Sequence, residues 1–305
     1  MREIHVEPKD YAYVIGPHLE PIATVQPGET VAFFTHDAFC DMLDSNDKVP
    51  ADIHMPPCPQ VGPVRIEGAE PGDTLKIEII SIERVRDWAV SAYRQELGAI
   101  VPTNTTRMLS GPIPEKTFIY HFDEATGKYR YNDKLCFDWE PFIGTIGCAH
   151  GLNSFMSITP FENGGNMDVP DVKPGNTLYL PVSCPGANFS IGDCHGRQGQ
   201  GEICGTALEI AAKVTLKFEL IKGKTITWPR IESDTEIMCV GAAKPMEDAA
   251  RIALCELIGW LVELGWDEME AYQAVSQCNK LYVGSMVNPN YVMVAKIDKE
   301  IAYRK

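Results

Sequence analysis

The sequence contains no apolar run as long as a membrane-spanning helix requires, and the pattern at its start does not predict a secretion signal. No stretch reaches the roughly 20 consecutive apolar residues that a membrane-spanning helix requires. The first five residues, Met1–His5, include an acidic side chain and no apolar segment, so they do not predict a secretion signal. Its 10 cysteines form no CxxC pair, which argues against a structural zinc knuckle. These absences predict a cytoplasmic protein with reduced thiols.

Positive charge is also scarce. The chain has 27 Lys and Arg residues against 42 Asp and Glu residues, a net charge of −15. Such an excess of negative charge disfavours binding to nucleic acids and to anionic membranes. The composition therefore predicts neither partner, and it leaves many carboxylates available to bind cations.

Several catalytic fingerprints are missing as well. The sequence contains neither GxGxxG nor GxxxxGK[ST], so it predicts no Rossmann or P-loop phosphate site. It has no GxSxG nucleophile elbow and no glycine- and serine-rich segment of the kind found in serine-dependent amidases. A cysteine nucleophile stays open, although none of the cysteines stands in a recognisable local signature.

The densest polar cluster that is present lies in a glycine-rich segment, 185–210, with the sequence PGANFSIGDCHGRQGQGEICGTALEI. If this chain is extended at 193–195, Asp193 and His195 point to one face and Cys194 points to the other, because strand side chains alternate. An acid and an imidazole on one face, followed by a flexible loop that carries Glu202, is typical of metal binding or acid–base catalysis. A plain turn built from Asp and Gly is the alternative interpretation.

Two weaker clusters accompany it. The segment NGGNMD at 163–168 places Asn166 and Asp168 two residues apart, like Asp193 and His195. The triplet Thr35-His36-Asp37 follows an apolar run. Each of these patterns alone is equally compatible with a turn or with a structural histidine.

Turn and strand patterns predict a mainly β fold. The chain has 22 prolines and 25 glycines, and a Pro-Gly-x-Thr-aliphatic turn begins at residues 27, 71 and 174. Alternating segments at 75–79 and 214–220 read as half-buried strands, and 129–135 reads as a hairpin. We therefore expect a β-rich body, sandwich- or barrel-like, over residues 1–240.

The character of the sequence changes near residue 245. Apolar residues recur at helical spacing over 245–264, and a capping pattern at Asp267 and Glu270 opens a second helix that reaches Cys278. The segments 281–283 and 291–294 read as returning strands. Residues 241–305 are thus expected to form a smaller α/β part with a helical hairpin, packed on the body.

Five segments together resemble the acetamidase/formamidase family. They are GPVRIEGAEPGD at 62–73, PFIGTIGCA at 141–149, GGNMD at 164–168, LYLPV at 178–182 and GDCHGRQGQGE at 192–202. The resemblance covers most of the chain in the family's order. It implies a β-rich fold, hydrolysis of short aliphatic amides to the acid and ammonia, and a metal-containing homo-oligomer. Gln200, His150 and Cys58 depart from the family's usual Asp, Pro and Asn or His.

An unactivated amide needs a strong nucleophile, a polarised carbonyl and a proton for the departing ammonia, and a metal ion with an acid–base group can supply all three. We expect Asp193 and His195 to be metal ligands, with Asp168 or Asp37 completing the set. Zinc is the first choice for such a site and calcium is the alternative.

The remaining site residues follow from the same reasoning. Glu202 is expected to act as base and proton carrier, Asn166 to orient the substrate amide, and Gln198 to contact the substrate. Two other functions remain open at this point: a non-catalytic small-ligand or calcium-binding module, and a metal-dependent hydrolase or isomerase of another small polar substrate.

Overall fold

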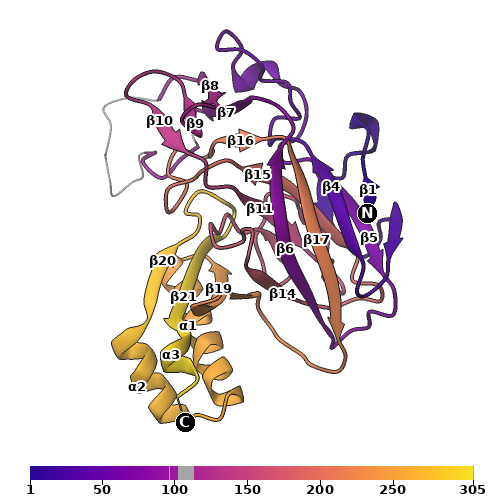
Figure 1. Cartoon of the computed structure of the whole chain (residues 1–305), viewed down its shortest axis with the longest axis vertical. Helices are drawn as coiled ribbons and strands as arrows, with labels where there is room; N and C mark the ends of the chain where they lie inside the picture. The colour runs from indigo at the N-terminus through magenta and orange to yellow at the C-terminus, as the bar shows by residue number, and fades with distance from the viewer. Residues whose placement is uncertain (96, 102–112, 305) are drawn as a thin grey trace.

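The computed structural model describes residues 1–95, 97–101 and 113–304, and two large sheets dominate it (Figure 1). In order, the nine-stranded sheet contains β1 (Arg2–Ile4), β4 (Thr30–Thr35), β17 (Ala212–Ile221), β6 (Thr74–Arg84), β14 (Thr177–Pro181), β18 (Arg230–Glu232), β19 (Glu236–Ala243), β21 (Tyr291–Asp298) and β20 (Lys280–Val283).

The path of the ten-stranded sheet runs through β10 (Cys136–Asp138), β9 (Lys128–Arg130), β8 (Lys116–Asp123), β7 (Trp88–Tyr93), β16 (Glu209–Ile210), β15 (Phe189–His195), β11 (Phe142–Gly147) and β13 (Gly164–Asn166). Its remaining strands are β5 (Gln60–Ile66), which pairs with β15, and β3 (Ala23–Val25), which pairs with β5. A small separate pair joins β2 (Val14–Ile15) to β12 (Phe155–Met156), and two 3₁₀ turns cover Pro8–Asp10 and Pro50–Asp52.

The two large sheets share one hydrophobic core, as in a β-sandwich. Phe33 of β4 and Phe218 of β17 come from the first sheet, and Phe189 of β15 comes from the second. Their ring centroids lie 5.1–6.1 Å apart with edge-on geometry, which is a favourable arrangement for buried aromatic rings. The predicted β-rich body is therefore confirmed as two sheets packed face to face.

The turns predicted from the sequence precede strands. Gly28, Gly72 and Gly175 each have a φ near +90°, a conformation that a type II turn requires and that glycine adopts without strain. The turns lead into β4, β6 and β14. The predicted hairpin at 129–135 is also present, because β9 and β10 pair antiparallel around it and the Asn132 side chain accepts bonds from two backbone amides of the turn.

The C-terminal helices cover one face of the first sheet, at the lower left of Figure 1. Helix α1 (Met246–Glu263) follows Pro245, and α2 (Glu268–Cys278) is capped by the Asp267 side chain, which accepts bonds from two backbone amides. A short α3 (Lys299–Ala302) follows β21. These elements confirm both predicted helices and the two returning strands, β20 and β21.

Alternation along β19 explains how one sheet serves two cores. Ile237 and Cys239 face a second hydrophobic cluster formed with α1 and α2, whereas Met238 and Val240 face the main core. The sheet thus continues without interruption across residue 240. The fold class is as predicted, while the division at 240 stays a prediction.

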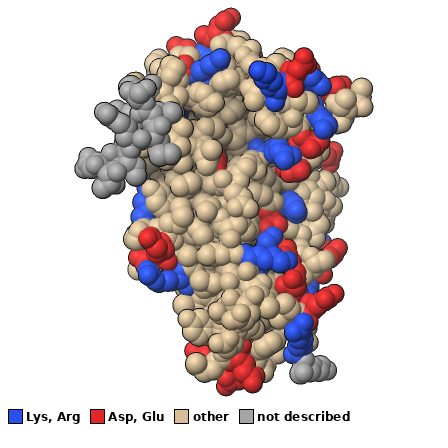
Figure 2. All heavy atoms as spheres, turned by 90° about the vertical axis from the view of Figure 1, so that its left-hand side faces the viewer, with Lys and Arg blue, Asp and Glu red and all other residues tan. Residues whose placement is uncertain are grey.

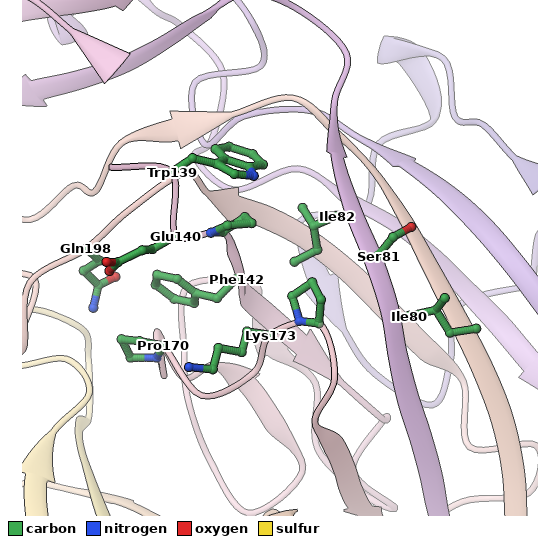
Figure 3. A pocket seen from close by; sticks show the side chains of 11 residues that line it. Ile80, Ser81, Ile82, Trp139, Glu140, Phe142, Pro170, Lys173 and Gln198 are labelled. Atoms are coloured by element: carbon green, nitrogen blue, oxygen red, sulfur yellow. The ribbon is translucent and has the colours of Figure 1, made fainter. Parts of the chain in front are cut away.

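The face shown in Figure 2 has an uncharged centre, with acidic and basic side chains mixed along its right-hand edge. A separate surface pocket of about 480 Å³ lies beside β6 (Figure 3). Phe142 and Gln198 line this pocket, and both also contact His195 at the end of β15. Among the described residues, no helix is both long and apolar enough to cross a membrane.

Candidate active site

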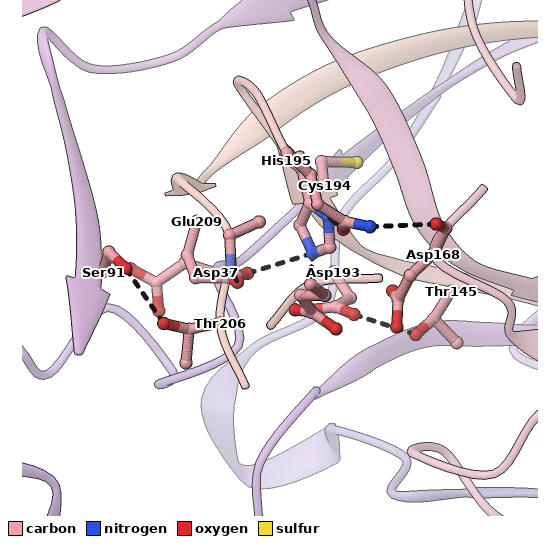
Figure 4. A network of polar contacts seen from close by, with 12 residues as sticks. Asp37, Ser91, Thr145, Asp168, Asp193, Cys194, His195, Thr206 and Glu209 are labelled. Atoms are coloured by element: carbon pink, nitrogen blue, oxygen red, sulfur yellow. Dashed lines mark hydrogen bonds and ion pairs between the residues drawn. The ribbon is translucent and has the colours of Figure 1, made fainter. Parts of the chain in front are cut away.

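Three polar side chains meet where β15 and β16 run side by side (Figure 4). Asp193 and His195 end β15, and Glu209 begins β16 directly opposite His195. His195 Nε2 lies 3.6 Å from Asp193 Oδ1 and 3.3 Å from Glu209 Oε2. All three side chains are buried. The sheet register therefore brings an imidazole between two carboxylates in the protein interior.

Two more carboxylates complete the cluster. Donor atoms of Asp168, Asp193 and His195 lie within 4.8 Å of one another, and the same holds for His195, Glu202 and Glu209. Asp168 Oδ2 accepts a hydrogen bond from Asn288 Nδ2 at 2.6 Å. We call these five residues the acid cluster. It contains four acidic side chains around one histidine.

Backbone strain concentrates at this site. Asp168, Asp193, Glu202 and the neighbouring Cys58 have φ values of +50° to +57°, a left-handed conformation that residues with a Cβ rarely adopt. The shared face of Asp193 and His195 is expected on the condition that the chain is extended at 193–195, and Asp193 does not meet that condition. Its carboxylate nevertheless reaches His195, because the left-handed turn at this one residue redirects the side chain into the cluster.

Glycine makes room for the cluster on the neighbouring strand. A Cβ on Gly144 of β11 would lie 2.6 Å from the Asp193 carbonyl oxygen and 2.8 Å from both Asp168 Oδ1 and His195 Cε1. No side chain fits there without displacing the cluster. The absence of a side chain at Gly144 therefore allows Asp168, Asp193 and His195 to approach one another across β11.

Gln198 fixes the protonation of His195. Its amide nitrogen donates to the backbone carbonyls of Asp168 and Gly284 at 3.1 and 3.0 Å, so its oxygen faces His195 Nδ1 at 3.0 Å. Since that oxygen only accepts, Nδ1 carries a proton. The ring of Phe142 packs edge-on against the imidazole at 4.9 Å. His195 therefore presents Nε2 to the carboxylates.

Burial and mutual repulsion change the pKa values of the cluster. Burial raises the pKa of Asp168 to about 6 and that of Glu209 to about 7. Burial and the charge of Asp168 raise the pKa of Glu202 well above 4.5. Burial alone would lower the pKa of His195, but the carboxylates of Glu209 and Asp193 outweigh it and raise that pKa. For Asp193, burial is outweighed by the charge of His195, and its pKa falls.

The donor atoms of the cluster fit a divalent cation. His195 Nε2 and Glu209 Oε2 are both buried without a hydrogen-bond partner, although they lie only 3.3 Å apart. Buried polar atoms rarely stay unpaired, and four carboxylates around one imidazole require positive charge. Extra protons, a metal ion or the Arg94 guanidinium, which lines the cavity beside the cluster, can supply that charge. One imidazole nitrogen with several carboxylate oxygens is a donor set that zinc accepts.

A small cavity of about 120 Å³ opens beside the cluster. Its polar end includes Asp193, Glu202 and Glu209 together with Asn166 and Asn288. Most of the other lining residues are apolar: Ala38, Phe39, Pro57, Cys58, Leu97, Ile158, Val287 and Pro289. Arg94 and Thr206 also line it, so the cavity combines charged and hydrogen-bonding side chains with apolar ones.

Most of the residues predicted from the sequence are brought together. Asp168, Asp193, His195 and Glu202 form the cluster, and Asn166 lies beside it. In the orientation that satisfies both ends of its amide, Asn166 donates to Asp193 Oδ2 at 2.7 Å and to Asp168 Oδ1 at 3.2 Å. Its amide therefore holds two carboxylates in place.

Asp37 is the exception, because the structure does not bring it into the cluster. Its carboxylate is buried and pairs with the Arg86 guanidinium. It also accepts bonds from the backbone amides of Phe39 and Asp41 at 2.8 and 2.9 Å. Arg86 and two amides of its own turn thus satisfy Asp37, so it is not part of the ligand set proposed below.

Sequence reasoning missed Glu209 and Asn288. Glu209 left a usable signal, since it is a lone acid within the apolar run ALEIAA at 207–212, and buried strands rarely carry an isolated charge without a function. Asn288 left none. Of the three departures noted above, only Cys58 lines the cavity, while Gln200 is exposed and His150 pairs with Glu162.

The comparisons with known proteins agree with this geometry. The model of the acetamidase/formamidase family matches residues 14–153 and 149–303, so the chain belongs to this family. A crystal structure of acetamidase from Yersinia enterocolitica is 40% identical, with a TM-score of 0.91 over 97% of this chain and 91% of that one. Acetamidase from Bacillus halodurans is 30% identical, with a TM-score of 0.88 over 98% and 97%.

A curated relative is more distant. The acetamidase of Mycolicibacterium smegmatis is 26% identical over 275 residues, which cover 70% of this chain and 66% of that protein. The match therefore spans just under two thirds of the length of that relative.

Proposed function

We propose that this chain hydrolyses short aliphatic amides, of the formamide and acetamide type, to the carboxylic acid and ammonia. Membership of the acetamidase/formamidase family supports the reaction class. The observation that carries the proposal is the cavity, which has a buried acidic end and an apolar wall. An amide group and a short acyl chain require those two environments.

The size of the cavity supports a short substrate. The cavity volume is about 120 Å³. Pockets for drug-sized ligands are several times larger, about 300–1,000 Å³. The cavity therefore suits amides with few carbon atoms and disfavours long or aromatic acyl groups.

A divalent metal ion belongs to the proposal. Asp168, Asp193 and His195 would hold it. Glu209, whose free Oε2 faces His195 Nε2, would be a further donor, although its own group of donor atoms within 4.8 Å is formed with His195 and Glu202. A metal ion bound there supplies Lewis acidity and lowers the pKa of water to about 7. Zinc fits the imidazole nitrogen, while calcium, which prefers six to eight oxygen ligands, is the alternative.

The residues of the chain supply the proton chemistry. Burial and the charge of Asp168 raise the pKa of Glu202, so this carboxyl can take a proton from the attacking water and hold it for the departing nitrogen. Ser285 Oγ donates to Glu202 Oε2 at 3.4 Å and holds it in the cavity wall. Gln198 keeps the proton on His195 Nδ1, which leaves Nε2 free to bind.

The roles predicted for Asn166 and Gln198 toward the substrate stay proposals. The amide of Gln198 is fully used by His195 and two backbone carbonyls, which supports a positioning role. Asn166 lines the cavity and also bonds Asp168 and Asp193. It is therefore the better candidate for a substrate contact.

The direct test is ammonia release from a panel running from formamide to hexanamide. We expect turnover of the shortest amides and a steep loss beyond about four carbons. His195→Asn should abolish it, whereas His121→Asn, at an exposed position on β8, should not. Failure of the wild type to release ammonia from any member of the panel would contradict the proposal.

We also propose that the chain forms a homo-oligomer and is located in the cytoplasm. Helices α1 and α2 expose several large apolar side chains, including Val262 (42% exposed), Met269 (70%) and Tyr272 (60%). Such a patch supports self-association. Sedimentation of the purified chain and of Tyr272→Glu measures it.

A further inference from the structure

The turn that contains Asp37 is held by an ion network that the reaction does not use. Arg86 contacts Asp37 and donates to Asp41 Oδ1 at 2.6 Å, and its guanidinium stacks on the Trp88 ring at 3.4 Å. His36 Nδ1 lies 2.5 Å from Asp41 Oδ2. The two terminal nitrogens of Arg86 thus contact two different carboxylates, and such charge-assisted contacts are stronger than neutral hydrogen bonds. Asp37 and Arg86 are mostly buried, so solvent screens their interaction little.

The network holds a tight and strained turn. Asp37 Oδ1 accepts from the backbone amides of Phe39 and Asp41, and its carbonyl accepts from Cys40 N at 3.0 Å. Cys40 and Asp41 both have left-handed φ values, +57° and +59°. Two successive left-handed residues with side chains are costly, so they persist only where surrounding contacts determine them.

This turn forms one wall of the cavity. Ala38 and Phe39 line it, and the Ala38 carbonyl accepts from Cys58 N at 2.9 Å, which attaches a third lining residue. Ala38, Phe39 and Cys58 belong to a hydrophobic cluster separate from the main core. We call these three residues the acyl wall. The position of the acyl wall depends on the Asp37 turn. The Phe39 amide donates to the Asp37 side chain, and the Ala38 carbonyl, in the same turn, accepts from Cys58 N.

The chemistry of the cavity decides which part of a substrate meets this wall. The carboxylates, Arg94, Asn166 and Asn288 are the charged and amide groups of the lining, so we expect the amide group of a substrate to face them. The acyl chain is then directed toward the apolar lining. Burial of the Cys58 thiol, together with the charges of Asp193 and Glu209, raises its pKa. Cys58 therefore stays a neutral, weakly polar part of the wall and is not a nucleophile.

We infer that the acyl wall sets the maximum acyl length, and that Asp37 with Arg86 is the positioning pair that holds the wall in place. Phe39 is the specificity-determining residue and Asp37 acts through it. The substrate class is unbranched primary amides, with discrimination against each added methylene. This inference rests on the proposed amide hydrolysis and assigns its selectivity to residues outside the acid cluster.

The test compares kcat/KM for acetamide and butyramide in the wild type, Asp37→Asn and Phe39→Ala, with bound metal measured in each. Asp37→Asn keeps an oxygen for the two backbone amides but presents the Arg86 guanidinium with an uncharged partner. One methylene in an apolar pocket changes selectivity by roughly 10- to 200-fold. We therefore expect the acetamide preference to fall at least about 10-fold in both variants, with metal content unchanged.

Asp73→Asn is the matched control. Asp73 is also buried, accepts from the backbone amides of Glu70 and Gly223 at 2.9 and 2.8 Å, and pairs with Lys222 at 2.6 Å. It lies in the turn before β6 and does not line the cavity. Asp73→Asn should lose about as much stability as Asp37→Asn, while its ratio of kcat/KM for acetamide and butyramide should stay that of the wild type.

The possible outcomes distinguish failure of the proposed amide hydrolysis from failure of the acyl-wall inference. No hydrolysis by the wild type overturns the proposed function itself. Hydrolysis with the same selectivity in the wild type and in folded Phe39→Ala overturns only this inference. Loss of metal in Asp37→Asn would restore Asp37 as a ligand and also overturn it, as would an equal selectivity shift in Asp73→Asn. If Asp37→Asn does not fold, Phe39→Ala alone decides.

Discussion

At the scale of single residues, the site is defined by one imidazole surrounded by four carboxylates. His195 Nε2 faces Asp193 and Glu209, while Gln198 holds the opposite nitrogen. A buried charge without a partner lowers the stability of a fold strongly. The arrangement fits the proposed cation site, and the raised pKa of Glu202 suits this carboxyl to the proposed role of taking up a proton and returning it.

Glu202→Gln tests the assignment of that carboxyl. The variant keeps the size of the side chain and removes its ability to take up a proton. Since positioned acid–base groups contribute about 10²–10⁴-fold, we expect turnover to fall at least about 100-fold, with fold and metal content retained. Stopped-time ammonia assays, metal analysis and thermal melting measure the three quantities.

Glu232→Gln controls for the loss of a partly buried carboxylate elsewhere. Glu232 accepts from Tyr179 Oη at 2.8 Å and pairs with Lys299 at 2.6 Å, outside the cavity lining. Its turnover should equal that of the wild type. Wild-type turnover in Glu202→Gln would contradict the proton-carrier role, and loss of metal would make Glu202 a ligand.

Cys194→Ser tests whether a thiol takes part. Cys194 is fully buried in the main core, its Sγ accepts from Thr35 Oγ1 at 3.4 Å, and burial raises its pKa to about 12. We expect turnover to be nearly unchanged, with about 1–3 kcal/mol of stability lost from burying a hydroxyl. Urea unfolding and ammonia release measure both effects. A loss of turnover by orders of magnitude would reassign Cys194 as a nucleophile.

Residue types near one another in the sequence predicted part of this site. The pattern of Asp193, His195 and Glu202 within one glycine-rich segment was sufficient to propose a ligand set and a proton carrier. Asn288 joins through a loop about 90 residues further on, so no local pattern could reveal it. In the sequence Asp37 lies beside His36, a pattern that fits a metal site as well as a turn. The structure shows the turn, with Arg86 as the partner of Asp37.

At the scale of elements, the site depends on β11 and β15 approaching closely. Gly144 faces the cluster, and a methyl group there would meet Asp168, Asp193 and His195. Gly144→Ala should therefore lose metal binding and turnover, with about 1–3 kcal/mol of destabilisation from overpacking. Metal titration by calorimetry and urea unfolding measure the two losses.

Gly259→Ala is the matched substitution in α1. A Cβ on Gly259 would meet no atom within 4 Å, and the residue is exposed within the helix. Since alanine favours helices, this variant should gain about 0.5–1 kcal/mol and keep full turnover. If Gly144→Ala kept metal binding and turnover as Gly259→Ala does, the close approach at Gly144 would not shape the site.

The elements themselves could be predicted better than their arrangement. Pro-Gly turns marked the starts of β4, β6 and β14, and spacing and caps marked α1 and α2. The sequence did not reveal that β15 lies between β11 on one side and β5 and β16 on the other. Pairing partners far apart in the chain depend on packing between sheets, which local patterns do not record.

At the scale of the whole molecule, the acid cluster links stability to pH. The pKa values of about 6 for Asp168 and about 7 for Glu209 exceed the ordinary 3.8 and 4.5. Between pH 4 and 7 these two carboxyls thus bind more protons in the folded chain without metal than in the unfolded chain, so their contribution to stability falls as pH rises. Asp193, whose pKa is lowered, acts in the opposite direction but only near and below pH 4.

Thermal melting of chelated protein across this range measures the effect. We expect the chelated protein to lose stability on the order of a few kcal/mol between pH 4.5 and 7.5. Added zinc should restore it, and its stabilising effect should grow with pH, because the ligands bind metal only when deprotonated. A zinc effect that is the same at both pH values would place the metal elsewhere.

The most direct test of the central claim is ammonia release from acetamide by one preparation in three states: as purified, chelated, and reloaded with one equivalent of zinc or calcium. Metal content is measured alongside each assay. We predict about one divalent ion per chain, loss of turnover on chelation and recovery with zinc. Full hydrolysis by protein shown to be free of metal would contradict the account.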